Sequence, residues 1–224
     1  MAAGGRGVRA AAAGAAAKQY RPIHGQPMLA HALRPFLDHP RVGPVVVVLP
    51  VEDAAAPPAW LVGLAPGRVL VVAGGATRQE SVAHGLRALP AGPVIVLVHD
   101  AARPFADRGL IDRVIAVAEL GAVGVPGLPL ADTVKETDAA GLVIRTVARE
   151  RFVAVQTPQS FPRATLETAH QRARGEAPAT DDAVLCERLG TAVRVVAGSP
   201  RNLKVTTAED IALAEALAAL DGGA

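Results

Sequence analysis

The segment His99–Pro104 places an acid and a base directly after an apolar run, at a position where chemistry is expected in an α/β protein. The run before it, Pro93–Val98, is rich in β-branched residues and predicts a buried parallel strand. Ligands of open α/β sheets bind beyond the carboxyl ends of the strands. There the Asp100 carboxylate could hold a divalent metal ion, and the Arg103 guanidinium could bind a phosphate. The alternative is that these two side chains pair with each other and only close a turn.

A second candidate site is the glycine-rich segment Ala3–Gly7, which is followed by Arg9 and Lys18. The backbone N–H groups of a glycine turn can approach phosphate oxygens closely, and the two basic residues would supply the matching positive charge. The segment lacks the full glycine spacing of a dinucleotide fingerprint, and the sequence has no Gly-Lys-Ser/Thr. Neither a dehydrogenase nor a P-loop nucleotidase is therefore favoured. The candidate phosphate-binding positions are Ala3, Gly4, Gly5 and Gly7.

Four shorter motifs allow either a functional or a purely structural interpretation. Gly74–Ser81 follows an apolar run and forms either the rim of a base pocket or an ordinary turn into a helix. Thr180-Asp181-Asp182 is typical of a helix cap, and Lys204 in Asn202–Thr206 is typical of a solvated lysine. Thr157-Pro158-Gln159 is the fourth. The sequence has neither zinc-ligand spacing nor a Gly-x-Ser-x-Gly elbow, which argues against a structural zinc and a serine hydrolase.

Strand-like and helix-like segments alternate along the chain, which predicts a largely parallel sheet with helices on both faces. The predicted strands are Val42–Leu49, Arg68–Val72, Pro93–Val98, Ala122–Pro126 and Thr191–Ala197. Pro27 is expected at the first position of a helix, Asp107 is expected to cap another, and Gln79–Leu89 is a third. A capping box of Thr206 and Glu209 is expected to begin the last helix.

The segment Leu130–Arg151 interrupts this alternation. Two short strand-like stretches flank Asp138-Ala139-Ala140-Gly141, which predicts a hairpin. The hairpin is mostly polar and has few apolar residues, so we expect it to protrude and to pack on a partner chain. The alternative is an ordinary surface hairpin.

The composition bounds the class of protein. A chain of 224 residues with 50% hydrophobic residues can bury a substantial core. Its net charge of +2 and 3% aromatic content argue against a nucleic-acid partner, and its apolar runs are strand-sized, so we expect no membrane partner. The single cysteine, Cys186, cannot form an internal disulfide, which fits a cytoplasmic location.

Taken together, in this order and spacing, the motifs resemble the 2-C-methyl-D-erythritol 4-phosphate cytidylyltransferase family, from about Ala3 to Leu217. The resemblance implies a single Rossmann-like α/β domain over residues 1–224, with 130–151 as a dimerisation arm. It also implies an enzyme that transfers CMP from CTP to methylerythritol phosphate with release of pyrophosphate, a step of the non-mevalonate isoprenoid pathway. Its most specific motifs are His99–Pro104, Asp132–Lys135, Gln156–Gln159 and Asn202–Thr206.

The resemblance also implies roles for individual residues. Arg9 and Lys18 would stabilise the pentacovalent phosphate, and Lys204 would reach the α-phosphate. Residues similar to the family's CTP contacts are Ala3, Gly4, Gly5, Gly7, Gly75, Arg78, Ser81, Asp100, Ala101 and Arg103, with Mg²⁺ at Asp100. Residues similar to its contacts with methylerythritol phosphate are Thr133, Arg149, Thr157, Thr180 and Lys204, of which Thr133 and Arg149 would come from the arm of a neighbouring subunit in a homodimer.

Two departures from the family pattern lead to further expectations. A strand of apolar residues precedes the glycine-rich loop in the family, whereas here Met1 stands directly before it. We therefore expect the sheet to lack its first strand and to leave backbone groups of its neighbours unpaired, either because the true start lies upstream or because the chain is damaged. Lys18 follows Ala17 rather than the usual Pro, in an alanine-rich loop. No segment after Leu217 indicates a fused domain.

Three other functions remain open from the sequence. The first is a related cytidylyltransferase that acts on ribitol 5-phosphate, although such sequences tend to have Val at the position of Ala102. The second is a non-catalytic CTP-binding homologue that lacks its first strand. The third is a flavodoxin-like module, which the sequence supports little.

Overall fold

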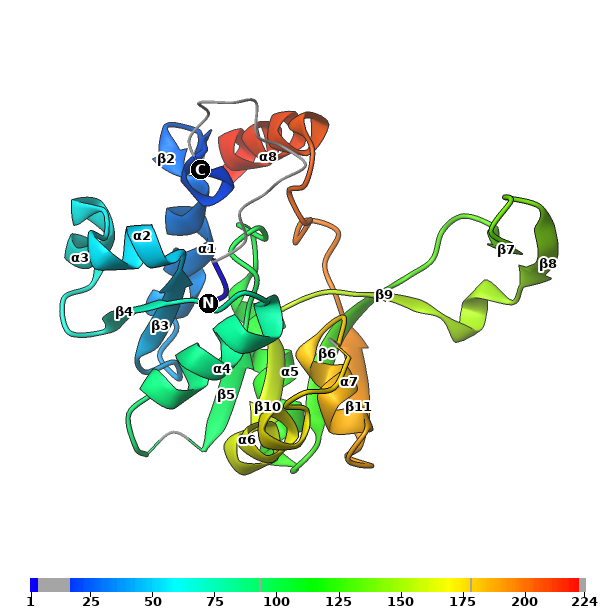
Figure 1. Cartoon of the computed structure of the whole chain (residues 1–224). Coiled ribbons are helices and arrows are strands. Elements are labelled where there is room, and N and C mark those ends of the chain that lie inside the picture. Colours follow the sequence, from blue (N-terminus) through cyan, green and yellow to red (C-terminus); the bar gives the residue numbers. More distant parts are fainter. Residues whose placement is uncertain (4–16, 93, 178, 222–224) are drawn as a thin grey trace.

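Two groups of strands form the centre of the chain in a computed structural model that describes residues 1–3, 17–92, 94–177 and 179–221 (Figure 1). The larger sheet has the order β11-β6-β10-β5, with β9 also paired to β6. The smaller sheet pairs β3 with β4. The strands are β3 (Val45–Leu49), β4 (Val69–Ala73), β5 (Ile95–Val98), β6 (Val123–Pro129), β9 (Val153–Val155), β10 (Gln159–Pro162) and β11 (Val193–Ala197).

The strand directions confirm the α/β class but make the sheet mixed. β3 runs parallel to β4, and β11 runs parallel to β6. β10, however, lies antiparallel between β5 and β6, and β9 is antiparallel to β6. The five strands that were predicted from β-branched runs all form, each beginning one to three residues later than expected. The antiparallel β10 was not expected, because Gln159–Pro162 has neither an apolar run nor a clear alternation.

Helices cover both faces of these strands, as predicted. On one face α1 (Met28–Leu37) and α5 (Arg108–Glu119) bury side chains such as Leu33 and Ile111 against Val47 of β3. On the other face α4 (Arg78–Ala88), α6 (Arg163–Arg172) and α7 (Asp182–Glu187) pack against Val96 and Val98 of β5. Successive side chains of a strand point to opposite faces, so each buried strand contributes to both layers.

Shorter elements surround the carboxyl ends of β3 and β4. The remaining elements in this region are η1 (Lys18–Tyr20), β1 (Pro22–Ile23), β2 (Gln26–Pro27), α2 (Val51–Ala55) and α3 (Ala59–Leu64). The final helix, α8 (Ala208–Asp221), packs Ala214 and Ala218 against Ile23 and Met28.

The helix starts show where cap prediction succeeds. Asp107 caps α5, with its Oδ1 accepting the Leu110 N–H at 2.7 Å, as predicted. Pro27 is the cap of α1 rather than its first residue. The predicted box of Thr206 and Glu209 is wrong by one residue: Thr207 Oγ1 accepts the N–H of Asp210 at 3.2 Å, and the Asp210 carboxylate accepts the N–H of Thr207 at 2.8 Å.

The predicted hairpin is present and extends away from the sheets (Figure 1). It consists of β7 (Val134–Thr137) and β8 (Val143–Val147), followed by η2 (Arg149–Arg151). Asp138 Oδ1 accepts two backbone N–H groups in the turn, and Gly141 has a φ of +83°, which favours glycine. We call residues 130–151 the arm.

Only Ala2 links the two sheets as a β partner among the described residues. Ala2 forms parallel bridges to Val48 at the end of β3 and to Asp100 just after β5. Over the rest of their length β3 and β5 are the neighbouring edges of two separate sheets.

Candidate functional site

A cavity of about 850 Å³ lies at the carboxyl ends of β3, β4 and β5. This is the edge at which ligands of α/β sheets bind. Segments far apart in the sequence line it: residues 2–3, 18–19, 50–52, 74–78, 100–102 and 204. The predicted site residues that it brings together are Ala3, Lys18, Gly75, Arg78, Ser81, Asp100, Ala101 and Lys204.

The Asp100 carboxylate sits between two cations in this cavity. Lys204 Nζ lies 2.8 Å from its Oδ2, and Arg78 Nε lies 3.2 Å from its Oδ1. Burial by itself would raise the pKa of Asp100, but these two cations outweigh burial and lower the pKa to about 2. Asp100 is therefore an anion at neutral pH. The simple pairing of Asp100 with Arg103 that the sequence left open is not what the structure shows.

Arg78 also binds a second, fully buried carboxylate that sequence reasoning missed. Its Nη1 lies 2.7 Å from Oδ2 of Asp182, whose side chain is 1% exposed. The other oxygen of Asp182 lies 2.9 Å from Nε2 of His170. Arg78 thus bridges Asp182 and Asp100, and its guanidinium is fixed at both ends. Asp182 and Arg78 lie 104 positions apart, so no sequence spacing could have indicated this contact.

The loop before Arg78 is held by its own side chains. Thr77 Oγ1 accepts the Glu80 N–H at 3.0 Å, and Glu80 Oε2 accepts the Ala76 N–H at 2.7 Å. Ser81 Oγ accepts the Gly75 N–H and donates to the Thr77 carbonyl. A Cβ on Gly75 would lie 2.4 Å from Cβ of Glu80, so the loop requires glycine there. Of the two interpretations of this motif, the helix-start turn is therefore present, and it also lines the cavity.

Lys18 reaches the cavity from a short 3₁₀ helix that is anchored to α2. The Tyr20 hydroxyl donates to Asp53 Oδ2 at 2.8 Å, and Gln19 Nε2 donates to the same oxygen at 3.4 Å. Gln19 is buried, whereas its neighbour Lys18 is only partly buried. The anchor therefore fixes the backbone from which Lys18 extends.

Thr157 supports Asp100 from the interior. Its Oγ1 accepts the Asp100 N–H at 3.0 Å and lies 3.0 Å from Nδ1 of His99. Nε2 of His99 donates to the Arg103 carbonyl at 2.9 Å, so the Thr157 hydroxyl donates to Nδ1. Burial lowers the pKa of His99 to about 4, and the imidazole is neutral. The hydroxyl of Thr157 therefore fixes the backbone at the end of β5.

Arg103 lies outside the residues that line the cavity. Its Nη1 donates to the Asn202 carbonyl at 2.8 Å, and its Nη2 donates to the Val155 carbonyl at 3.4 Å. The Asn202 side chain in turn donates to the Thr157 carbonyl at 2.8 Å. In the described structure Arg103 thus ties together the segments that carry Thr157 and Lys204 rather than facing the cavity.

The remaining candidate residues are placed as follows. Thr133 and Arg149 lie exposed on the arm, which extends away from the sheets (Figure 1), and neither lines the cavity. Arg149 Nη1 donates to the Ala131 carbonyl. Thr180 is exposed before α7, whose cap is Asp181, as the Thr-Asp-Asp motif indicated. The predicted positions outside the described residues are Gly4, Gly5, Gly7 and Arg9.

The donor set around Asp100 suits Mg²⁺ held jointly with a substrate. Within the described ranges no three acidic, His or Cys side chains gather into a cage for a metal ion. Mg²⁺, however, commonly binds through one or two carboxylates and the phosphates of a substrate. Asp100 is ionised at neutral pH, and each of its oxygens has a second lone pair beyond the one facing a cation. The residues present therefore fit the ion.

Comparison with known proteins decides the family. The family model for IspD, 2-C-methyl-D-erythritol 4-phosphate cytidylyltransferase, matches residues 1–219. The chain belongs to this family. A bifunctional enzyme IspD/IspF of Nitratidesulfovibrio vulgaris is 47% identical over 222 residues, which cover 96% of this chain and 56% of that protein. This chain of the IspD family thus spans about half the length of the curated relatives it matches.

Solved structures support the same assignment. The 2-C-methyl-D-erythritol 4-phosphate cytidylyltransferase of Thermus thermophilus is 40% identical, with a TM-score of 0.77 over 90% of this chain and 94% of that one. The 4-diphosphocytidyl-2C-methyl-D-erythritol synthase of Anaerococcus prevotii is 28% identical, with a TM-score of 0.81 over 88% of each chain. In the described part of this IspD-family chain, no helix combines the length and apolarity that crossing a membrane requires.

Proposed function

We propose that this chain transfers CMP from CTP to 2-C-methyl-D-erythritol 4-phosphate and releases pyrophosphate. The observation that carries the proposal is the cavity at the carboxyl ends of the strands, which Lys18 lines and in which Arg78 and Lys204 contact Asp100. Membership of the IspD family supports the two substrates. The location proposed for the reaction is the cytoplasm, and residues 1–224 are proposed to act as one domain that carries the arm.

The chemistry requires positioning and positive charge rather than a strong base. The attacking phosphate oxygen of methylerythritol phosphate is already anionic, and it must lie in line with the departing pyrophosphate. Two anions repel, so cations must offset that repulsion and the charge that develops on the α-phosphate. We assign this role to Lys18 and Lys204, together with Arg9. A magnesium ion bound at Asp100 would supply additional positive charge to the triphosphate.

The other predicted contacts complete the proposal. Gly75 and Ser81 would border the cytosine, because they line the cavity next to Arg78. Ala3, Gly4, Gly5 and Gly7 would wrap the triphosphate, with Ala101 on the ribose side and Arg103 as a helper that holds the surrounding segments in place. Thr157 and Thr180 would contribute to the site for methylerythritol phosphate from the same chain.

We further propose a homodimer in which each arm completes the site of the other subunit. Thr133 and Arg149 lie on the arm and are not among the residues that line the proposed active-site cavity, and Leu142, Val143 and Ile144 there are 59–69% exposed. Three consecutive exposed apolar residues on a two-stranded arm fit burial against a partner chain.

The first experiment measures pyrophosphate release from CTP and Mg²⁺, with and without methylerythritol phosphate. Release that requires methylerythritol phosphate supports the proposal. Release that requires ribitol 5-phosphate instead would show that ribitol 5-phosphate is the acceptor. CTP binding in calorimetry without turnover would favour the non-catalytic homologue. The same pyrophosphate-release assay is applied to a form of the chain that is extended at its amino terminus.

A mixing experiment tests the shared site. Arg149→Ala removes an arm residue and Lys204→Ala removes a cavity residue, so each variant alone is expected to be inactive. Random re-pairing makes half of the dimers mixed, and each mixed dimer has one intact site, so the mixture is expected to recover about a quarter of wild-type activity. Failure to recover activity, although both variants exchange subunits, would place the arm residues outside the site.

A further inference from the structure

Lys204 reaches the proposed active site from a segment that is neither helix nor strand. Residues 198–207, all of which the structure describes, connect β11 to α8. We call residues 198–204 the Lys204 loop. Lys204 Nζ lies 2.8 Å from Asp100 Oδ2, but the Lys204 side chain is 46% exposed and has a flexible stem. The backbone of the loop therefore decides which positions the ammonium can reach.

The side chain of Gln156 binds the backbone of this loop from the interior. Gln156 is 4% exposed, and its own N–H donates to the Pro126 carbonyl of β6 at 2.7 Å. Its Nε2 donates to the Ser199 carbonyl at 2.9 Å and to the Asn202 carbonyl at 3.2 Å, and its Oε1 accepts the Ser199 N–H at 3.1 Å. One side-chain amide thus pairs with both backbone groups of Ser199, as a neighbouring strand would. An amide is needed here, because a carboxylate has no donor and an ammonium has no acceptor.

The side chain of Asn202 makes the reciprocal contact. It is completely buried, and its Nδ2 donates to the carbonyl of Thr157, the residue that follows Gln156, at 2.8 Å. Gln156 therefore binds the backbone of the loop, and Asn202 on the loop binds the backbone next to Gln156. We call these two side chains the amide clasp. They lie in the motifs Gln156–Gln159 and Asn202–Thr206, but neither of them lines the active-site cavity.

Gly198 allows the clasp to close. Its N–H donates to the Gly127 carbonyl at 2.9 Å. A Cβ at position 198 would lie 2.7 Å from Gln156 Oε1 and 3.0 Å from the Gly127 carbonyl oxygen. One of these atoms is backbone, and the other is held by its bond to the Ser199 N–H. The clasp therefore requires glycine at the start of the loop.

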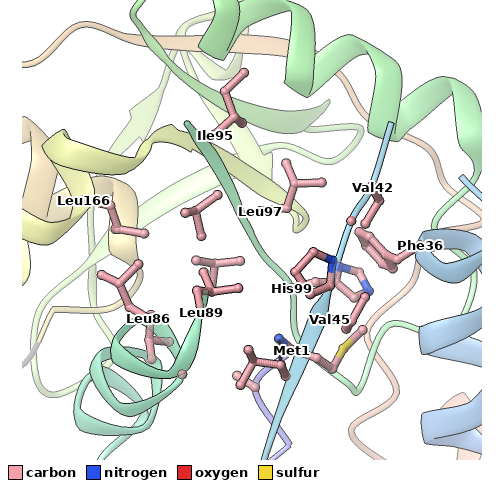
Figure 2. A pocket seen from close by; sticks show the side chains of 18 of the residues that line it. Met1, Phe36, Val42, Val45, Leu86, Leu89, Ile95, Leu97, His99 and Leu166 are labelled. Atoms are coloured by element: carbon pink, nitrogen blue, oxygen red, sulfur yellow. Dashed lines mark hydrogen bonds between the residues drawn. The ribbon is translucent and has the colours of Figure 1, made fainter. Parts of the chain in front are cut away.

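The clasp is connected to Asp100 as well as to the loop. Thr157, whose carbonyl accepts from Asn202, also accepts the Asp100 N–H through its Oγ1. The same hydroxyl lies 3.0 Å from Nδ1 of His99, and the His99 ring packs against Phe36 with 4.8 Å between the ring centroids (Figure 2). The backbones that carry the carboxylate and the ammonium are thus held by one buried network.

We propose that Gln156 and Asn202 are positioning residues for Lys204 in the transfer of CMP. The clasp holds the backbone of the Lys204 loop so that the ammonium can reach the α-phosphate of the bound nucleotide. When the ammonium leaves Asp100 for that phosphate, the ion pair no longer holds the loop, and the clasp keeps its backbone in place. This role rests on the proposed function.

Gln156→Met tests the clasp, because methionine has a similar size and lacks the amide. The loop keeps the bond from the Val205 N–H to the Ala102 carbonyl, so we expect it to loosen while the chain still folds. At a temperature well below the Tm, kcat is expected to fall about 10–100-fold, because a displaced cation stabilises the developing charge less. The Kd for CTP is expected to change less than about 3-fold. Asn202→Ala is expected to have effects in the same directions.

Arg68→Met is the matched control. Arg68 also donates to two backbone carbonyls, those of Leu37 at 2.6 Å and Val42 at 2.7 Å, and none of these residues lines the active-site cavity. Both substitutions are expected to lower the Tm, but only Gln156→Met is expected to lower kcat. Equal kcat values in the two variants would show that the clasp only stabilises the fold, and would overturn the proposal.

Amide hydrogen exchange follows the loop without requiring turnover. In Gln156→Met the amides of Ser199 and Asn202 are expected to exchange at least about 10-fold faster, while that of Ile111 in α5 changes little beyond the global effect. Unchanged exchange in the loop would overturn the proposal even if kcat fell. A wild-type chain that releases no pyrophosphate would overturn the proposed function together with this role, whereas wild-type turnover that Gln156→Met retains would overturn the role alone.

Discussion

The bridge from Arg78 to the buried Asp182 gives the sharpest stability prediction. In Asp182→Asn the shape is kept, but the side chain offers one oxygen where the carboxylate offered two. The carboxylate faces Arg78 Nη1 at 2.7 Å and His170 Nε2 at 2.9 Å, so one of these two partners faces an amide nitrogen in place of a charged oxygen. A hydrogen bond to a charged group contributes about 1.5–3 kcal/mol.

The expected loss of stability in Asp182→Asn lies in the lower half of the range of about 1.5–3 kcal/mol, for a structural reason. Removing one partner of a buried pair costs about 3–5 kcal/mol when the other charge is left uncompensated. The Arg78 side chain, however, is 32% exposed and keeps its contact with Asp100, so water and that carboxylate compensate it in part. We therefore expect a loss of about 2 kcal/mol, which corresponds to a fall in Tm of about 4–8 °C for a chain of this size.

Urea and thermal unfolding of the purified chain measure this loss. The matched control is Glu136→Gln, which removes the ion pair with Arg145 on the arm, where the side chains are 45% and 71% exposed. Exposed pairs of this kind contribute about 0–1 kcal/mol. A double-mutant cycle of Arg78→Leu with Asp182→Asn is expected to give a coupling of at least about 1 kcal/mol. A cost of Asp182→Asn no larger than that of the control would refute the reasoning.

Three further predictions concern charge. Lys18→Ala is expected to lower kcat by about 10²–10³-fold and to change the Kd for CTP much less, because the cation acts mainly on developing charge; equal losses in the two constants would contradict this. The pKa of Asp100 is about 2 in the folded chain and 3.8 ordinarily, so its contribution to stability is complete above about pH 4 and is lost as the pH falls toward 2. In an acid titration, the free energy of unfolding of Asp100→Asn should therefore fall less steeply than that of the wild type. The pKa of the Met1 amine is about 6 when folded and 8.0 ordinarily, so the unfolded chain binds more protons between these values and stability should rise from pH 6 to pH 8; Nα-acetylation should abolish that slope, measured as Tm against pH.

The sequence predicts the strands that carry their own signal. Val45–Leu49 and Ile95–Val98 are continuous apolar runs, and such runs are typical of strands that are covered by helices on both faces. β10 carries no such signal, because Gln159–Pro162 is polar at two positions and ends in proline. Its place in the sheet comes from pairing with β5, about 60 residues earlier, and local patterns contain no information about that pairing.

The candidate site likewise has residues that the sequence could place and residues that it could not. Asp100 could be placed from sequence, because a carboxylate after a buried strand lies at the edge where ligands bind. The convergence of Arg78 and Lys204 on it depends on the order of the strands, and here the sequence was interpreted through a family resemblance. The contacts of Asp182 with Arg78 and His170 had no signal at all, since a Thr-Asp-Asp motif predicts a cap and only Asp181 serves as one.

The buried carboxylate explains how Asp100 can exchange partners without losing its position. Lys204 is 46% exposed and has a flexible stem, so we expect it to leave Asp100 for a phosphate when a triphosphate enters the cavity. Arg78 would then be the remaining side-chain cation on Asp100, and it is held by the buried pair of Asp182 and His170. In this arrangement Lys204 moves to bind the substrate, whereas Arg78 stays in place and holds Asp100. Asp182 therefore matters for the site although it touches neither the cavity nor a substrate, and its loss should raise the KM for CTP as well as lower the Tm.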